Sequence, residues 1–394
     1  MKTGNAILSG YGTTIFEVMS RLADEHGAIN LGQGFPDTRG PADVLDVASR
    51  ALLDGWNQYP SMMGTPDLRQ ALAAHAARFY GLTVDWKTEV LVTSGATEAL
   101  TASLLGLIEP GDEVVLFQPM YDSYLPIIRL AGGVPRFVTL KAPDWSFTRD
   151  DLEAAFSPKT KLIVLNDPLN PAAKVYGRDE LDLIAEFVRR FDAYAVCDEV
   201  YEHLVFDGRR HIPLMTLPGM RDRCLKIGSA GKTFSLTGWK VGYITGAAPL
   251  LQPVAKAHQF LTFTTPPNLQ TAVAYGLGKE DGYFTGLAAE MQAKRDRLAA
   301  GLSAAGLDVL PSAGTYFIVA RIGAAAAANA GFAEGGIDDQ DFCRWLTAEA
   351  GVAAIPVSAF YVQNAPNNCI RFCFSKRDEI LDEAADRLKR RFSV

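Results

Sequence analysis

Six short runs of β-branched and other apolar residues follow one another through the middle of the chain. They lie at residues 90–93, 113–117, 135–140, 161–166, 194–199 and 224–229. The stretches between them have helical patterns, so each run is interpreted as a strand and each stretch as a crossover helix. Apolar runs without polar alternation are typical of strands buried on both faces. The pattern therefore predicts an α/β fold whose large domain has a mostly parallel sheet flanked by helices on both faces.

The pattern changes after about residue 268. The later segments are a long helix at 269–305, a strand at 315–321, a helix at 339–350, apolar runs at 352–357 and 369–375, and a charged final helix. The first 40 residues are rich in glycine, proline and polar residues, which favours an arm followed by an extended segment. We therefore expect a smaller α+β domain that is made from both ends of the chain.

These observations divide the chain into three ranges. Residues 1–44 form the N-terminal arm and part of the small domain, residues 45–285 form the large α/β domain, and residues 286–394 complete the small α+β domain. The segment 323–339 is of low complexity, and we expect it to be a flexible surface loop.

Composition excludes several classes of protein. Hydrophobic residues make up 48% and charged residues 21% of the chain, which is typical of a globular protein and not of a disordered one. The 38 basic and 45 acidic residues give a net charge of −7, which does not favour a nucleic-acid partner. No run approaches the roughly 20 apolar residues that span a bilayer, and the N-terminus has no secretory pattern. We expect a cytoplasmic protein with neither a nucleic-acid nor a membrane partner.

The five cysteines are scattered. They are Cys197, Cys224, Cys343, Cys369 and Cys373, and none is paired at Cys-x-x-Cys spacing. Reduced and mostly buried thiols are the simplest interpretation, and no metal site is predicted.

The segment SAGKTFSLTGWKVGY at 229–243 follows an apolar strand and holds Lys232 between small residues. Burial disfavours the charged form of a lysine, and a neutral amine can attack a carbonyl to make a Schiff base. From this segment alone, a surface lysine on a connecting loop is the simpler interpretation.

Two further polar segments follow strands. Asp198 ends the run AYAV, where ligands bind in open α/β sheets, although an aspartate there can equally cap the next turn. The loop LNDPLNPAAKVY at 165–176 carries Asn170 between prolines, and a loop of this composition is commonly only a turn. Both segments are placed to contact a ligand at the same edge of the sheet.

Three weaker signals complete the set. VTSGATEAL at 92–100 passes from a strand to a helix N-terminus, whose free N–H groups suit a phosphate. Tyr121 follows another strand and can present its ring to a planar ligand, or belong to the core. Arg371 lies among apolar neighbours in NCIRFCFS, and a buried arginine usually grips a structural or substrate carboxylate.

Together these segments resemble the fold-type I aminotransferases that use pyridoxal 5′-phosphate. Within them, the chain is similar to the class I/II group that includes kynurenine–oxoglutarate, glutamine–phenylpyruvate and methionine aminotransferases. The resemblance covers nearly the whole chain. It rests on NLGQGFPD (30–37), NQYPSMMGTPDLRQAL (57–72), SGATEAL, the Asn-Pro loop, CDEVYEHLVFDG (197–208), SAGKTFSLTGWKVGY and the late arginine, in that order.

The resemblance implies roles around the cofactor ring. Lys232 would hold the cofactor aldehyde as a Schiff base, and Asp198 would pair with the pyridinium nitrogen. Asn170 and Tyr201 would bond the phenolic oxygen, while Tyr121 would stack on the ring. Lys232, Asp198 and Tyr201 are the expected catalytic residues.

It also implies a phosphate site and a dimer. Backbone groups of Ala96 and Thr97, the Ser229 hydroxyl and Lys240 would hold the phosphate. The family often has arginine where Lys240 stands, and lysine keeps the charge without the bidentate fork. Tyr59 is similar to the tyrosine that reaches the partner subunit's phosphate, which implies a homodimer with shared active sites.

For the substrate, Arg371 would clamp the α-carboxylate, helped by Asn170 and the backbone of Gly34. The residues after Asn170 differ from the family pattern, which usually has Thr-Gly or a similar pair after Asn-Pro. The resemblance therefore does not predict the conformation of the local turn. The resemblance also does not predict which residues contact the substrate side chain. Three aromatic residues are candidates: Phe35, Tyr11 and Phe360.

The implied reaction is a ping-pong transfer of an amino group from an uncharged, sulfur-containing or aromatic L-amino acid to a 2-oxo acid. Methionine, glutamine, kynurenine and phenylalanine represent the expected donors, because no second arginine stands out for a dicarboxylate side chain. Cysteine-conjugate β-lyase activity and an aminotransferase for aspartate or succinyl-diaminopimelate are alternatives on the same cofactor.

Two other classes are disfavoured. A non-catalytic regulator on this fold would carry an added basic DNA-binding module, and we expect the roughly 30 residues before Gly32 to leave no room for one. A nicotinamide-dependent dehydrogenase would need a Gly-x-Gly-x-x-Gly turn. Gly32-Gln33-Gly34 is followed by Phe35-Pro36-Asp37, without the third glycine.

Overall fold

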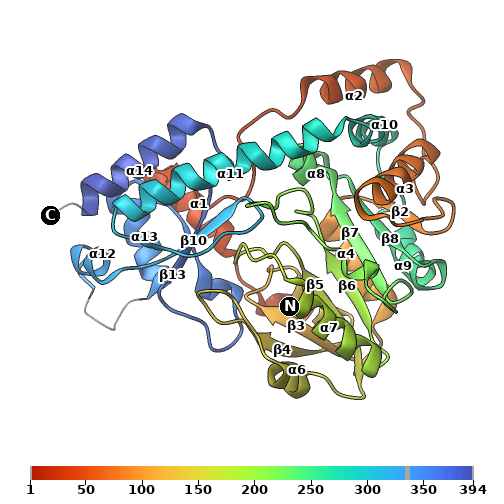
Figure 1. Ribbon diagram of the computed structural model, residues 1–394, viewed down its shortest axis with the longest axis horizontal. Coiled ribbons are helices and arrows are strands. Elements are labelled where there is room, and N and C mark those ends of the chain that lie inside the picture. The colour runs from red at the N-terminus through yellow and green to blue at the C-terminus, as the bar shows by residue number, and fades with distance from the viewer. Residues whose placement is uncertain (1, 333–337, 393–394) are drawn as a thin grey trace.

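The computed structural model describes residues 2–332 and 338–392 of the chain. Figure 1 shows the strands β2 to β8 and their helices on one side of the molecule, and strands β10 and β13 with α1, α13 and α14 on the other. Helix α11 (Asp281–Ala304) extends from beside α10 (Pro267–Leu277) into this second part.

A seven-stranded sheet forms the larger part. Its strands are β2 (Val90–Thr93), β3 (Glu113–Gln118), β4 (Val134–Thr139), β5 (Thr160–Asn166), β6 (Tyr194–Asp198), β7 (Cys224–Ser229) and β8 (Gly242–Gly246), in the order β2-β8-β7-β6-β5-β3-β4. The six predicted strands are all present, and the mostly parallel sheet is confirmed. β8 was not predicted, and it pairs antiparallel with both β2 and β7.

Helices cover both faces of this sheet. One face packs against α4 (Ala96–Leu107), α5 (Tyr124–Leu130) and α9 (Ala248–Leu261), and the other against α6 (Arg149–Ala155) and α7 (Arg178–Arg190). Successive residues of β5 point to opposite faces, so Leu162 joins the first core and Ile163 the second. The continuous apolar runs in the sequence follow from this burial on both sides.

A further core lies at the β2 end of the sheet and contains Val44, Leu68 and Val92. It is covered by helices α2 (Ala42–Asp54), α3 (Pro66–Tyr80) and α10. Short helices follow the strands at α8 (Ala230–Thr233), η2 (Leu214–Thr216) and η3 (Thr237–Trp239). None of the helices among the described residues has both the length and the apolar character needed to cross a membrane.

The smaller part is built from both chain ends, as predicted. Its core joins Met19 and Leu31 from the N-terminal segment with Leu298, Phe372 and Phe392 from the C-terminal one. Its elements are η1 (Leu8–Gly10), α1 (Ile15–His26), β1 (Ile29–Asn30), β9 (Asp308–Val309), β10 (Phe317–Arg321), α13 (Asp339–Glu349), β11 (Val352–Ala353), β12 (Ile355–Pro356), η4 (Val357–Phe360), β13 (Cys369–Cys373) and α14 (Asp378–Phe392). The domain boundaries at 44/45 and 285/286 stay predictions.

Three expectations from the sequence were wrong in detail. The long helix at 269–305 is two helices, α10 and α11, separated at Gly278–Glu280. The loop expected at 323–339 contains helix α12 (Ala324–Asn329), because alanine has the highest helix propensity and Ala326 and Ala327 are buried. Residues 333–337 of that segment lie outside the described residues. The N-terminal arm holds α1, which was not expected.

Candidate active site

A cavity of about 360 Å³ opens where the carboxyl ends of the central strands meet the smaller part. All the residues predicted to bind the cofactor or the substrate carboxylate, except Tyr59, line it: Gly34, Ala96, Thr97, Tyr121, Asn170, Asp198, Tyr201, Ser229, Lys232, Lys240 and Arg371. These residues come from strand ends, helix N-termini and both chain ends. The fold thus brings together residues that are more than 330 positions apart in sequence, such as Gly34 and Arg371.

Lys232 belongs to α8, the single helical turn that follows β7. Its Nζ donates to the Tyr316 hydroxyl at 2.8 Å and lies 5.6 Å from the centre of the Tyr201 ring. Close packing holds the turn, because a Cβ at Gly231 would lie 2.9 Å from the Thr237 Cα. The lysine is therefore half-buried in the cavity and is not a surface residue of a connecting loop.

Asp198 is the last residue of β6 and is buried. One carboxylate oxygen, Oδ2, accepts from the Tyr124 hydroxyl at 2.6 Å, while Oδ1 has no hydrogen-bond partner. Burial raises the pKa of Asp198 to about 6, because it outweighs the hydrogen bond from Tyr124 and the charge of Lys232, which favour the ionised form. A protonated ring nitrogen placed in the cavity would supply both the missing donor and a further positive charge.

The loop after β5 links the carboxylate site to the arginine. Asn166 Nδ2 donates to the Asp198 carbonyl at 2.8 Å, and Asn166 Oδ1 accepts from the Asn170 backbone N–H at 2.8 Å. The side-chain oxygen of Asn170 accepts from Arg371 at 2.8 Å. The turn that departs from the family pattern is closed by Ala173, which has a φ of 56°.

Arg371 lies in the middle of β13 and is 1% exposed. Its Nη1 bonds Asn170, its Nη2 donates to the Gly32 carbonyl at 2.9 Å, and its Nε has no partner. Its guanidinium lies 3.9 Å from the centre of the Phe317 ring. Burial lowers the pKa of Arg371 to about 10, so the group stays charged near neutral pH. Its hydrogen-bond partners are neutral oxygens, which leaves the cation available to a carboxylate ligand.

The opposite end of the cavity is suited to a phosphate. Gly95 precedes α4 with a φ of 81°, and a Cβ there would come within 3.3 Å of Lys240 Nζ. A Cβ at Gly242 would lie 2.5 Å from the Gly95 carbonyl carbon, so the two backbones approach this closely only because residue 242 is glycine. The first N–H groups of α4 have no intrahelical partner, and together with Lys240 they favour an anion.

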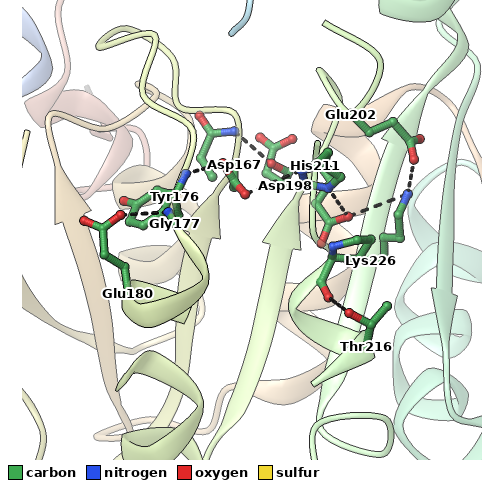
Figure 2. A network of polar contacts seen from close by, with 12 residues as sticks. Asp167, Tyr176, Gly177, Glu180, Asp198, Glu202, His211, Thr216 and Lys226 are labelled. Carbon is green, nitrogen blue, oxygen red and sulfur yellow. Dashed lines mark hydrogen bonds and ion pairs between the residues drawn. The ribbon is translucent and has the colours of Figure 1, made fainter. Parts of the chain in front are cut away.

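A second group of buried ionisable residues lies beside the cavity. We call it the network cluster and define it as Asp167, Glu199, Glu202, His211 and Lys226. Figure 2 labels all of these residues except Glu199. Glu202 accepts from Lys226 at 2.7 Å, and His211 contacts Glu199 at 2.8 Å and Asp167 at 3.5 Å. Asp198, Lys232 and Arg371 are called the pocket cluster below.

The charges of the network cluster compensate one another. Burial opposes the imidazolium of His211, but Glu199 and Asp167 outweigh burial and raise the pKa of His211 to about 10. Burial likewise opposes the charges of Glu202 and Lys226, yet their mutual attraction lowers the pKa of Glu202 and raises that of Lys226. All three groups are therefore charged at neutral pH.

Tyr59 lies outside the cavity. Its side chain is 82% exposed and contacts the Phe263 ring at 5.7 Å between ring centres. Among the residues offered for the side-chain pocket, Phe35 and Tyr11 are exposed, and neither they nor Phe360 lines the cavity. Phe360 is buried with its ring centre 5.1 Å from the Arg371 guanidinium.

Sequence reasoning missed several aromatic and polar residues of the site. They are Phe16, Gln33, Tyr124, Tyr316 and Phe317. The signal for each was weak, because an aromatic residue in an apolar segment is most often part of the core.

Comparison with known proteins identifies the class of protein that this fold and cavity belong to. A methionine aminotransferase from Escherichia coli superposes with a TM-score of 0.93 at 38% identity, covering 99% of this chain and 100% of that one. N-succinyldiaminopimelate aminotransferase from Mycobacterium tuberculosis gives 0.93 at 43% identity with the same coverage. The fold is that of the fold-type I aminotransferases, as predicted.

The sequence model of the aminotransferase class I and II family matches residues 26–388, and this chain belongs to that family. A probable N-succinyldiaminopimelate aminotransferase of M. tuberculosis is 44% identical over 97% of this chain and 96% of its own length. Kynurenine–oxoglutarate transaminase of Dictyostelium discoideum is 39% identical over 96% of this chain and 94% of its own length. The protein is a pyridoxal 5′-phosphate-dependent aminotransferase, which confirms the predicted enzyme class and cofactor.

Proposed function

We propose that the cavity holds pyridoxal 5′-phosphate against Lys232 and Asp198, and an α-amino acid against Arg371. One observation carries this proposal. Lys232, Asp198 and Arg371 line one cavity, and the aspartate and the arginine each have a buried polar atom without a hydrogen-bond partner. Because unpartnered buried polar atoms are costly, these atoms fit a ligand that is cationic at one point and anionic at another.

Each residue of the cavity then has a chemical task. When bound, the cofactor supplies an electron sink for the electron pair left at the substrate α-carbon. The Lys232 amine holds the cofactor aldehyde and, when free, carries a proton from the substrate Cα. The ionised carboxylate of Asp198 keeps the ring nitrogen protonated, because a nearby opposite charge favours the charged form. Tyr201 and Asn170 bond the phenolic oxygen, and Tyr121 stacks on the ring.

The phosphate belongs at the N-terminus of α4. Ala96 and Thr97 offer backbone N–H groups there, Ser229 adds a hydroxyl and Lys240 adds a positive charge. A lysine charge balances the phosphate as an arginine charge would, but it has fewer directed donors.

The walls near Arg371 support an uncharged donor side chain. Phe16 and Phe317 line the cavity beside the arginine, together with the polar side chain of Gln33. Among the described residues that line the cavity, Arg371 is the only arginine. The proposed donors are therefore amino acids of the methionine, glutamine, kynurenine or phenylalanine type, with Arg371, Asn170 and Gly34 at the α-carboxylate.

The 44% identity to a probable N-succinyldiaminopimelate aminotransferase supports a second candidate. That substrate carries an acidic side chain, which a single arginine in the described lining serves less well. Cysteine-conjugate β-lyase activity is the third candidate, because it needs the same cofactor and the same proton removal at Cα.

We further propose a homodimer in which Tyr59 reaches the partner's phosphate. Four large apolar side chains, Tyr59 among them, support it: Leu53, Trp56, Tyr59 and Phe260 are each at least 79% exposed. Exposed apolar side chains that gather in one patch mark a protein interface. We also propose a reducing, cytoplasmic location, which the five buried free thiols support.

A donor and acceptor panel with the purified holoenzyme tests the proposed substrate class. We expect single-turnover rates with methionine, glutamine, kynurenine and phenylalanine to exceed those with aspartate and N-succinyl-diaminopimelate. Release of pyruvate and ammonia without an added 2-oxo acid would reassign the main activity to β-elimination. Turnover confined to the acidic donors would overturn the proposed substrate class, and a monomer in analytical ultracentrifugation would overturn the dimer.

A further inference from the structure

The hydroxyl group of Tyr316 links its own segment to two other segments of the site. The residue is 1% exposed and directly precedes β10. Its oxygen accepts from Lys232 Nζ at 2.8 Å and lies 2.6 Å from the Gly34 carbonyl oxygen. It thereby connects the turn after β7 with the N-terminal segment that we assign to the substrate carboxylate.

The direction of these two hydrogen bonds is fixed by chemistry. A carbonyl oxygen can only accept, so Tyr316 must donate its single proton to Gly34. The tyrosine oxygen can then only accept from Lys232. The lysine therefore uses an N–H group for this contact, and the lone pair of its neutral amine is left free. A tyrosine proton pointing at the lysine would occupy that lone pair instead.

The backbone beside Tyr316 is strained. Thr315 has a φ of 67° and is fully buried, and a β-branched residue in the left-handed region is rare. The conformation is held by a bond from the Thr315 N–H to the Leu204 carbonyl at 2.9 Å, and by one from the Phe317 N–H to the Thr315 hydroxyl at 3.0 Å. Strain maintained in this way is concentrated at functional sites.

The strained turn places two neighbouring rings against residues that line the cavity. Tyr316 contacts Lys232, while Phe317 stacks on Arg371 with its ring centre 3.9 Å from the guanidinium. A Cβ at Gly34 would lie 2.7 Å from the Phe317 ring, so the N-terminal segment fits closely over the pair. One turn therefore sets the relative position of the lysine, the arginine and the Gly34 backbone.

We propose that Tyr316 is a positioning residue for Lys232, which holds the free amine through an N–H so that its lone pair can bond carbon or take a proton. The bond to Gly34 ties this position to the segment that binds the substrate carboxylate. The inference rests on the proposed role of Lys232 and adds a residue that acts through it.

The test is Tyr316→Phe, which keeps the ring and removes only the hydroxyl. Apoenzyme is mixed with pyridoxal 5′-phosphate, and the visible absorbance of the covalent product is followed. We expect covalent capture to slow by about tenfold while the final amount bound stays within about twofold, because the amine is present but misdirected. With donor in excess, the single-turnover rate of Cα proton removal is expected to fall about 10- to 100-fold, and the half-saturating donor concentration to change less than about threefold.

Tyr283→Phe is the matched control. The Tyr283 hydroxyl donates to the Thr233 carbonyl at 2.9 Å, one residue from Lys232, without touching Nζ. We expect both rates to stay within about twofold of the parent, because only a neighbouring structural bond is lost. Equal slowing in both variants, or parental rates in Tyr316→Phe, would overturn the proposal.

Two further results separate the possible failures. If Tyr316→Phe does not fold, Thr315→Gly keeps the tyrosine but frees the turn, and it should slow the same two rates by about threefold. Unchanged rates in that variant would also count against the proposal. Failure of the parent enzyme itself to form a covalent product at Lys232 would instead refute the proposed function.

Discussion

Two clusters of buried ionisable residues lie next to each other at the carboxyl end of β6. Their charges and hydrogen-bonding groups are paired in different ways. Asp198 and Glu199 are consecutive, yet Asp198 lines the cavity and Glu199 belongs to the network cluster. In the network cluster, each acid faces a base. Asp167 Oδ2 and His211 Nδ1 make no hydrogen bond, but they lie 3.5 Å from each other as an ion pair. In the pocket cluster, Asp198 Oδ1 and Arg371 Nε have no partner within the described part of the chain.

The difference separates structure from function. A buried charge that already has its counter-charge contributes to a single packed arrangement, and nothing further needs to bind there. A buried polar group without a partner costs free energy, and it is expected where a ligand completes it. The four predictions that follow test this distinction, from the largest expected effect to the smallest.

Asp198→Asn removes the carboxylate charge that the pocket cluster provides for the ring nitrogen. We expect the variant to bind the cofactor but to remove the Cα proton roughly 10³-fold more slowly, because the charge that stabilises the protonated ring is lost. Rapid mixing of holoenzyme with a saturating donor measures this single-turnover rate. A rate equal to that of the parent would contradict the assigned role.

Glu202→Gln breaks the network cluster. The buried ammonium of Lys226 loses its closest counter-charge, so the free energy of unfolding should fall by about 3 kcal/mol in urea denaturation. Adding Lys226→Met should restore much of the loss, since no unpaired charge is then buried. Glu186→Gln, which removes an exposed partner of Arg149, is the control and should change nothing measurable. If Glu202→Gln lost turnover but kept its stability, Glu202 would belong to the pocket cluster and not to the network cluster.

Arg371→Lys weakens the substrate end of the pocket cluster. Lysine keeps the charge but loses the planar fork that reaches Asn170, Gly32 and a carboxylate together. We expect KM for the amino donor to rise by roughly 30-fold, with a smaller effect on kcat. Steady-state kinetics with one donor measure both quantities, and an unchanged KM would rule out carboxylate binding at this residue.

The pH dependence of stability should also differ between the clusters. The pKa of His211 is raised to about 10 from an unfolded value near 6.5, so its stabilisation is complete below pH 6.5 and is lost as the pH rises through about 10. Between pH 7 and 8 the parent should therefore lose about 1 kcal/mol more stability than His211→Gln. Parallel pH profiles of the two proteins would show that the imidazolium is not stabilised as described.

Much of the fold could be predicted because burial on both faces leaves a clear trace in the sequence. Most of the strands β2 to β7 are apolar runs, although the edge strand β4 contains Arg136 and is only partly buried. In contrast, β8 is a short Gly-Tyr-Ile-Thr-Gly segment that directly follows a polar motif. The missed helix α1 did leave signals. Thr14 caps its N-terminus by accepting from the Glu17 N–H, and Gly27 ends it in the left-handed conformation.

Site residues could be predicted where a charged residue type is unusual for its apolar sequence context. A lysine after a buried strand and an arginine in an apolar strand stand out, and both line the cavity. Tyr124, Tyr316 and Phe317 do not stand out, since their roles depend on which groups the fold places opposite them. The left-handed conformation of Thr315 left no trace either, because that conformation is expected of glycine and not of threonine.

The central claim is that Lys232 is the covalent attachment point of the cofactor. The most direct measurement is borohydride reduction of freshly isolated enzyme, followed by peptide mapping with mass spectrometry and with Lys232→Ala as the control. We expect one pyridoxyl-modified peptide that contains position 232, and no modified peptide in the variant. Absence of the label in the parent after incubation with excess coenzyme, or its attachment to another lysine such as Lys240, would contradict it.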